Sequence, residues 1–241
     1  MDKNEMRPGG TQAVQAGIAL QLVIFLVAAA ILIPALTPGS VVAGGLLIKV
    51  LFLARIAALV ALADWMLRRQ SLKWSDVGLH RPAWQRFLLA LLIGAVMTFV
   101  SSAAARNVII YFGLPAPNYS AFAPIKGNFG EYLYWAVPVT LVSAAFGEKL
   151  IFRGFVTDAL RRLLGETCVA GPFAALLLQA VIFGALHFYQ GAGGMIAAGL
   201  TGFALGTTWL IARRNLWAGI VLHAFLDGTA MTAIYLGYVG P

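Results

Sequence analysis

The sequence predicts an all-α protein, a polytopic transmembrane bundle of about seven membrane helices, or eight if one further segment is re-entrant. Three observations predict it: 61% of the 241 residues are hydrophobic, only 11% are charged, and two long stretches, Pro8–Ile48 and Thr167–Ala212, carry no charge. A soluble domain is about 45–50% apolar and about 25% charged, and one core of this size cannot bury so much apolar surface. The composition therefore excludes a soluble enzyme, a nucleic-acid-binding protein and a disordered chain.

The expected spans follow the apolar runs and are separated by turn-forming residues. Thr37-Pro38-Gly39-Ser40 ends the first span, the loop Gly113–Gly130 is rich in Gly, Pro and Asn, and Gly191–Gly194 divides the second charge-free stretch in two. A bilayer takes about 20 residues of helix. The seven spans are expected at about Ala13–Leu36, Val42–Leu67, Phe87–Phe112, Glu131–Arg162, Gly171–Phe188, Met195–Ala212 and Leu216–Tyr238.

Basic residues are concentrated in alternate connections between these spans, and cytoplasmic loops collect such residues. The net charge of +8 has the same origin. The pattern places the polar N-terminal segment Met1–Gln12 in the cytoplasm and the C-terminus outside, in what we expect to be a bacterial inner membrane. One integral membrane domain is expected over residues 1–241, with the lipid bilayer around it, and nothing in the sequence indicates its oligomeric state. The connections hold Arg68, Arg69, Lys73, Arg81, Arg86, Arg161, Arg162, Arg213 and Arg214.

A few ionisable residues fall within the spans, and they predict a functional site because charge is costly in lipid. Glu148 lies in the fourth span, His187 ends the fifth, and His223 and Asp227 share a helix face of the seventh at a spacing of four residues. A glutamate with two histidines is typical of hydrolytic sites. Taken singly, each histidine is also compatible with a hydrogen-bonded packing role, and Glu148 with a structural ion pair to Arg153.

Further charges in the membrane segments are less informative. Glu148 and Phe152 are expected to share a helix face because they are four residues apart. Asp158 is a further carboxylate of the fourth span. Lys49 and Arg55, in the second span, either line a cavity or extend their charged ends to the interface.

Three short motifs resemble those of one family. Gly147-Glu148-Lys149-Leu150-Ile151-Phe152-Arg153-Gly154 is similar to the E-E-x-x-F-R-G motif of the CPBP intramembrane proteases, the CAAX-protease and bacteriocin-processing (Abi) family. Phe183–His187 matches the F-x-x-x-H motif of that family, and His223–Asp227 matches its H-x-x-x-N/D motif. Order and spacing agree over a motif-bearing core of about residues 131–236.

The resemblance implies hydrolysis of a peptide bond within the membrane, as in type II CAAX prenyl endopeptidases. It implies Glu148 as the base that activates water, His187 and His223 as the groups that position it, Asp227 as the partner of His223, and Arg153 as a support for Glu148 or a carbonyl. The substrates implied are prenylated C-terminal peptides, leader peptides and membrane-anchored proteins. Two mechanisms are compatible with the resemblance. In one, His187 and His223 hold a divalent metal such as zinc, with Glu148 and Asp227 as further candidate ligands. In the other, Glu148 acts without a metal.

One position departs from the family pattern. Lys149 stands where the second glutamate of the first motif is usual. Successive helix residues point about 100° apart, so Lys149 need not face the groups that Glu148 faces, but a cation beside Glu148 favours the charged carboxylate and weakens it as a base. The alternative is therefore a catalytically impaired member with an immunity, scaffold or regulatory role. A transporter or proton relay is a third hypothesis. It predicts inverted internal repeats, and the sequence shows none.

The expected boundaries contain one conflict. They place Glu148 and His223 in the cytoplasmic half of the bilayer and His187, about sixteen residues into the fifth span, near the outer face. The motifs require these residues to meet. Either the fifth span begins late, after an interfacial segment that includes Leu160–Pro172, or the fourth span is tilted and longer than its expected bounds.

Overall fold

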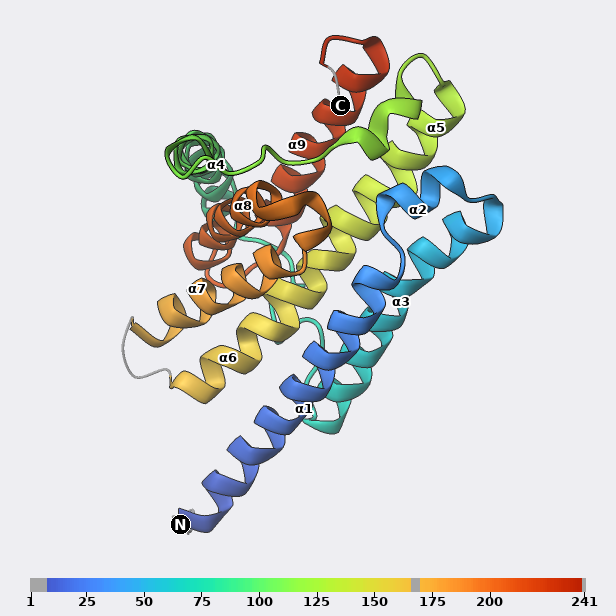
Figure 1. Cartoon of the computed structure of the whole chain (residues 1–241). Helices are drawn as coiled ribbons and strands as arrows, with labels where there is room; N and C mark the ends of the chain where they lie inside the picture. Colours follow the sequence, from blue (N-terminus) through green and yellow to red (C-terminus); the bar gives the residue numbers. More distant parts are fainter. Residues whose placement is uncertain (1–7, 166–169, 240–241) are drawn as a thin grey trace.

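The computed structural model describes residues 8–165 and 170–239, and in these residues all regular structure is helical, with no strand (Figure 1). Residues 1–7 of the expected cytoplasmic N-terminus lie outside the described residues. In chain order the elements are α1 (Pro8–Ala35), α2 (Pro38–Ala43), α3 (Leu46–Arg69), α4 (Trp84–Tyr111), η1 (Ser120–Ile125), α5 (Phe129–Tyr134), η2 (Trp135–Gly147), η3 (Lys149–Val156), α6 (Thr157–Leu164), α7 (Ala170–Ala185), η4 (Phe188–Gln190), α8 (Gly191–Ile211) and α9 (Trp217–Leu236).

Within the described residues, 6 helical segments are long and apolar enough to cross a membrane: Gln12–Ala35, Leu46–Arg69, Trp84–Tyr111, Phe129–Leu164, Phe188–Ile211 and Trp217–Leu236. The chain is therefore an integral membrane protein. The expected fifth span is the exception, because α7 has 16 residues and reaches only about 24 Å, less than the hydrocarbon core of about 30 Å. It ends at Ala185 because the chain then tightens, and the His187 amide donates to the Gly184 carbonyl three residues back at 3.0 Å.

The expected fourth span is one continuous helical run of 36 residues, Phe129–Leu164, built from α5, η2, η3 and α6. Figure 1 shows this run passing through the middle of the molecule, between the α1–α3 pair and the group of α4, α8 and α9. Its central part is π-helical: the Glu148 amide donates to the Ser143 carbonyl, five residues back. π-Helical turns are rare and occur often at functional sites, where the wider turn changes which side chains share a face.

Apolar side chains hold α1 and α3 to the central run. Phe25 of α1 and Phe155 of η3 are both fully buried, with ring centroids 4.8 Å apart. Leu59 of α3 and Ile151 of η3 belong to the same buried cluster. On the other side α7 packs closely on α8. A Cβ on Gly184 would lie 2.6 Å from the Met195 carbonyl oxygen, so only glycine leaves room for this approach.

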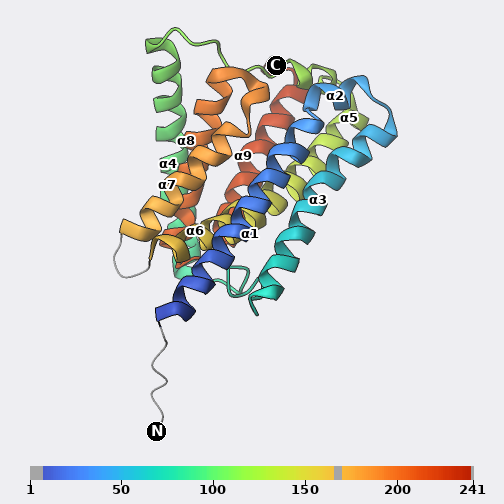
Figure 2. The same cartoon turned by 60° about the horizontal axis from the view of Figure 1, so that its bottom comes forward.

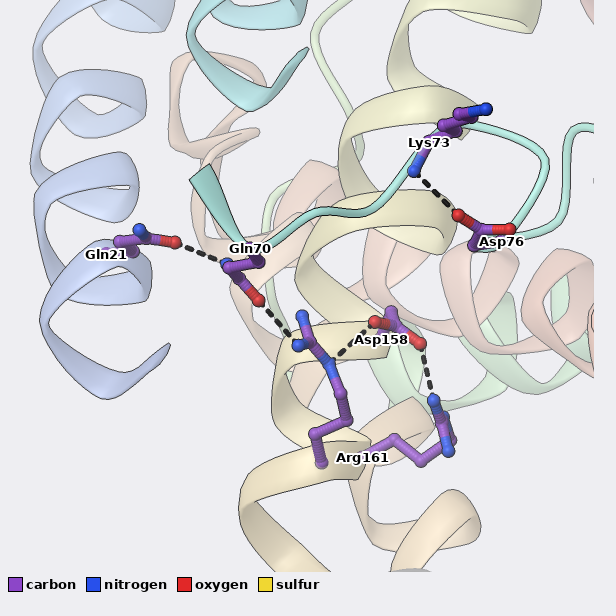
Figure 3. Close-up of polar contacts among 7 residues, drawn as sticks. Gln21, Gln70, Lys73, Asp76, Asp158 and Arg161 are labelled. Atoms are coloured by element: carbon purple, nitrogen blue, oxygen red, sulfur yellow. Dashed lines mark hydrogen bonds and ion pairs between the residues drawn. The ribbon is translucent and has the colours of Figure 1, made fainter. Parts of the chain in front are cut away.

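A polar network ties the helices together at the end of the bundle where α1 begins (Figure 3). Asp158, buried at the start of α6, accepts from Arg161 at 2.6 Å and pairs with Arg162 at 2.8 Å. Arg162 donates to Gln70 at 2.5 Å, and Gln70 donates to Gln21 of α1. Asp158 therefore serves a structural ion-pair network.

The three basic connections lie together at this end. Arg162 reaches Gln70 after α3, and the Leu216 amide, before α9, donates to the Gly78 carbonyl at 3.0 Å. Gly78 has a φ of 114°, and a Cβ there would lie 2.1 Å from the Arg214 carbonyl oxygen, so this contact requires glycine. α1 begins at this end and α9 finishes at the opposite one (Figure 2).

Candidate active site

A cavity of about 530 Å³ lies between the helices. Its lining includes Glu148, His187, His223 and Asp227, which come from the central run, the turn after α7, and α9. The three sequence motifs, up to 79 residues apart between Glu148 and Asp227, thus contribute side chains to one cavity. A volume of this size is within the range of about 300–1,000 Å³ that is usual for small-ligand pockets.

The depth conflict between His187 and Glu148 disappears with the observed boundaries. Glu148 lies sixteen residues before the end of α6, a rise of no more than about 24 Å, and His187 lies seventeen residues after the start of α7, a rise of about 25 Å. The two residues are therefore about level. The fourth span ends only two residues later than expected, at Leu164, a rise of about 3 Å, so the conflict came mainly from assigning the two residues to opposite halves of the bilayer. The fifth span does not begin late: Leu160–Leu164 belongs to α6 and α7 is already helical at Ala170, while residues 166–169 lie outside the described residues.

Glu148 has a free carboxylate. It is half-buried at the junction of η2 and η3, and no hydrogen bond or ion pair to its carboxylate occurs within residues 8–165 and 170–239. The structural ion pair with Arg153 is therefore not formed. A carboxylate that faces a cavity without a cation partner can accept a proton from a water molecule there.

His187 is oriented by its own helix. Its Nδ1–H donates to the Phe183 carbonyl at 2.8 Å, which fixes the proton on Nδ1 because a carbonyl only accepts. In the neutral imidazole Nε2 then carries the lone pair and can accept a hydrogen bond. The ring packs between Phe183 and Tyr189, with centroids 4.6 Å and 5.7 Å away.

His223 is engaged at both ring nitrogens. Nε2 lies 3.1 Å from Asp227 Oδ2 on the same face of α9, the predicted i,i+4 contact. Nδ1 bonds the Lys149 ammonium, which is buried to 1% exposure. Because Asp227 accepts from Nε2–H, Nδ1 is the acceptor for Lys149. Lys149 therefore does contact the candidate site, although its side chain points about 100° away from that of Glu148 around the helix.

Two motif residues lie behind the cavity wall. Arg153, expected to support Glu148 or a carbonyl, donates from Nη2 to the Gly202 carbonyl of α8 at 2.9 Å and stacks over Phe183 at 4.8 Å. Phe152 packs edge-on against Phe183, with centroids 5.1 Å apart. Phe152 does not line the cavity with Glu148, because the wide π-helical turn shifts the i,i+4 relation.

The donor set fits a metal ion poorly in this arrangement. Among residues 8–165 and 170–239, no group of three or more His, Cys, Asp or Glu is placed so that it could hold a metal. His223 would have to release Lys149 or Asp227 before either nitrogen could act as a ligand. A metal-binding His normally has one nitrogen on the metal and only the other in a hydrogen bond.

Several cavity residues have no place in the motifs. Arg55 of α3, Tyr119, Tyr189, and Thr140 of η2 all line the cavity. Burial raises the pKa of Tyr119, and the nearby Asp227 charge raises it further, so the phenol stays neutral and can donate a hydrogen bond. Arg55 was detectable in the sequence as a charge within an apolar span, whereas the tyrosines resemble ordinary aromatic residues of membrane interfaces.

The fold and cavity define a class: a polytopic helical membrane protein with two carboxylates and two histidines around one cavity. Residues 130–229 match the family described as type II CAAX prenyl endopeptidase Rce1-like, and this segment is a domain of that family. The matched segment begins in α5, ends in α9 and includes all three motifs. No curated protein and no solved structure matches the chain.

Proposed function

We propose that the protein is an intramembrane endopeptidase that hydrolyses a peptide bond of a membrane-associated substrate. One observation carries the proposal: the free carboxylate of Glu148 shares a cavity with His187, whose Nε2 is left as an acceptor. Membership of residues 130–229 in the type II CAAX prenyl endopeptidase Rce1-like family supports it. Prenylated C-terminal peptides, leader peptides and membrane-anchored proteins are the substrate classes to test.

The mechanism needs only side chains of the chain and water. Glu148 takes a proton from a water molecule that is oriented by a hydrogen bond to His187 Nε2, and the resulting hydroxide adds to the scissile carbonyl carbon. The proton on Glu148 then passes to the amide nitrogen, the carbon–nitrogen bond breaks, and an acid and an amine leave. His223, held by Asp227, forms the opposite wall.

Arg153 acts as a positioning residue. Its hydrogen bond to the Gly202 carbonyl joins η3 to α8, and its contact with Phe183 joins both to the helix that orients His187. A metal-dependent variant of the reaction would instead use His187 and His223 as ligands, and it requires His223 to exchange one of its present partners.

The orientation proposed is N-terminus inside, in a bacterial cytoplasmic membrane. It rests on the basic connections, which the contacts of Arg162 with Gln70 and of Leu216 with Gly78 bring to the end where α1 begins. The positive-inside rule places that end in the cytoplasm. Protease accessibility of tags at the two termini of the protein in inverted vesicles tests this orientation.

Lys149 favours a second candidate function, a non-catalytic relative with an immunity, scaffold or regulatory role. Its ammonium occupies His223 Nδ1 and places a cation on the site where the family pattern has a carboxylate. A cleavage assay that compares the wild-type protein with Lys149→Glu separates the candidates. Activity that appears only in Lys149→Glu supports the non-catalytic function, and activity in the wild-type protein excludes it.

The proposal is tested with purified full-length protein in proteoliposomes. Three reporters are offered: a prenylated C-terminal peptide, a leader peptide and a single-span anchored protein, with products identified by mass spectrometry. Hydrolysis adds one water across the cleaved bond, and Glu148→Ala should abolish it. Product formation that persists unchanged in Glu148→Ala would refute the proposal.

A further inference from the structure

Arg55 of α3 is a fixed cation at the wall of the cavity, outside the segment that matches the family. Its Nε donates to the Phe52 carbonyl at 3.1 Å, and its Nη1 donates to the carbonyls of Ile33 and Leu36 at the end of α1. The guanidinium lies 3.7 Å from the centre of the Phe52 ring. Three carbonyls and an aromatic face therefore hold this group in one place.

Within the described residues Arg55 has no carboxylate partner, unlike Lys49 and Arg162. Lys49 on the same helix pairs with Glu131 at 2.5 Å, and Arg162 pairs with Asp158 at 2.8 Å. In the described residues no carboxylate lies within 4.0 Å of Arg55, and its Nη2 makes no hydrogen bond there. Nη2 is not one of the polar atoms of the described residues that are fully buried without a partner. A ligand can therefore reach it.

The charges of the cavity wall are unevenly placed. Arg55 is the single Lys or Arg in the lining that the described residues form, and the carboxylates there are Glu148 and Asp227. A ligand anion gains a charge-assisted hydrogen bond at Arg55 and is repelled by the two carboxylates. Guanidinium groups suit carboxylates because their N–H donors match the two oxygens.

We propose that Arg55 binds a carboxylate of the peptide substrate and thereby sets which peptide bond lies against Glu148. This inference rests on the proposed function. A cavity of about 530 Å³ holds a short stretch of peptide, so the carboxylate lies only a few residues from the scissile bond. It is either the C-terminal carboxylate or an acidic side chain, two sources of the same chemistry.

The binding test uses full-length Glu148→Gln protein in detergent, so that ligands are not consumed. Three libraries of random hexapeptides are compared: a free C-terminal acid without Asp or Glu, the corresponding C-terminal amide, and an amide with one Glu. Retained peptides are quantified by mass spectrometry. We expect the acid library, the Glu library or both to be retained about tenfold to a hundredfold above the neutral amide, the range of one charged hydrogen bond.

Arg55→Gln, added to Glu148→Gln, should abolish this preference, because the amide can still donate to the carbonyls at the end of α1 but carries no charge. The matched control is Lys49→Gln, which removes a cation from the same helix that does not line the cavity; it should leave the preference intact. Equal retention of charged and neutral libraries, or a preference that survives Arg55→Gln, would overturn the inference.

A kinetic comparison in the active protein separates this inference from the proposed function. With a cleavable peptide, Arg55→Gln should raise KM for the carboxylate form to that of the neutral form and leave kcat close to wild type. A purely structural Arg55 would change both forms alike. If the binding preference is present but no peptide is cleaved, the hydrolytic function fails and the carboxylate site stands; if cleavage occurs without a preference, the carboxylate site fails.

Discussion

Lys149→Met is expected to stabilise the protein. The Lys149 ammonium is 1% exposed, and no carboxylate in the described residues lies within 4.0 Å of it. Removing an ammonium from water costs several kcal/mol in real proteins, and the hydrogen bond to His223 returns about 1.5–3 kcal/mol. Methionine has a similar length and carries no charge, so the substitution removes that net cost.

The substitution leaves His223 Nδ1 without its partner. An unpaired buried acceptor costs about 1–3 kcal/mol, and the low end applies because the ring lines the cavity, where water can reach it. The balance favours Lys149→Met by about 1–2 kcal/mol. For a chain of this length that corresponds to an increase in Tm of about 2–8 °C.

The assay is thermal unfolding of the purified proteins in detergent, followed by tryptophan fluorescence. Lys49→Met is the matched control with the opposite sign, because it leaves Glu131, whose side chain is 23% exposed, without its partner at 2.5 Å. A lower Tm for Lys149→Met would refute the reasoning and would make Lys149 a structural residue. A higher Tm would mean that Lys149 lowers the stability of the protein, as functional residues often do.

Three further predictions follow from the contacts. Asp158→Asn removes the carboxylate that pairs with the largely buried Arg162 and should lower the free energy of unfolding by about 3–5 kcal/mol, whereas Asp64→Asn, at an exposed pair, should change it by about 1 kcal/mol or less in the same urea titration. Asp227→Asn keeps an acceptor for His223 and should retain most of the cleavage rate. Asp227→Leu should lower the cleavage rate about tenfold to a hundredfold. Equal rates for the two variants would contradict the proposed role of Asp227 as the partner of His223. Gly184→Leu should force α7 from α8 and lower Tm, and an unchanged Tm would show that the close approach is not required.

Much of the fold follows from apolar patterning. The runs that end at Ala35, Arg69 and Tyr111 lie within a few residues of their expected boundaries, because helices in lipid must satisfy their backbone internally and charges or turn residues end them. The short α7 was not predicted, since the apolar character continues through Leu186 and Phe188 while the backbone tightens at His187.

The candidate site was predictable in its residues and less so in its contacts. Glu148, His187, His223 and Asp227 are polar groups in apolar spans, and the motifs single them out. The bond from Lys149 to His223 depends on the π-helical register of η2 and η3, which the i,i+4 pattern of the sequence does not contain. Arg55 lies in a different part of the chain, and only the packing of α3 on the central run brings it to the cavity.

The central claim, that Glu148 activates water in this cavity, is tested most directly by the cleavage rate of Glu148→Gln in proteoliposomes, measured beside Glu131→Gln. Both substitutions remove one carboxylate from the same helical run, but Glu131 pairs with Lys49 and does not line the cavity. The account predicts that Glu148→Gln lowers kcat by at least about a hundredfold and that Glu131→Gln cleaves at close to the wild-type rate. Cleavage by Glu148→Gln at the wild-type rate would contradict it.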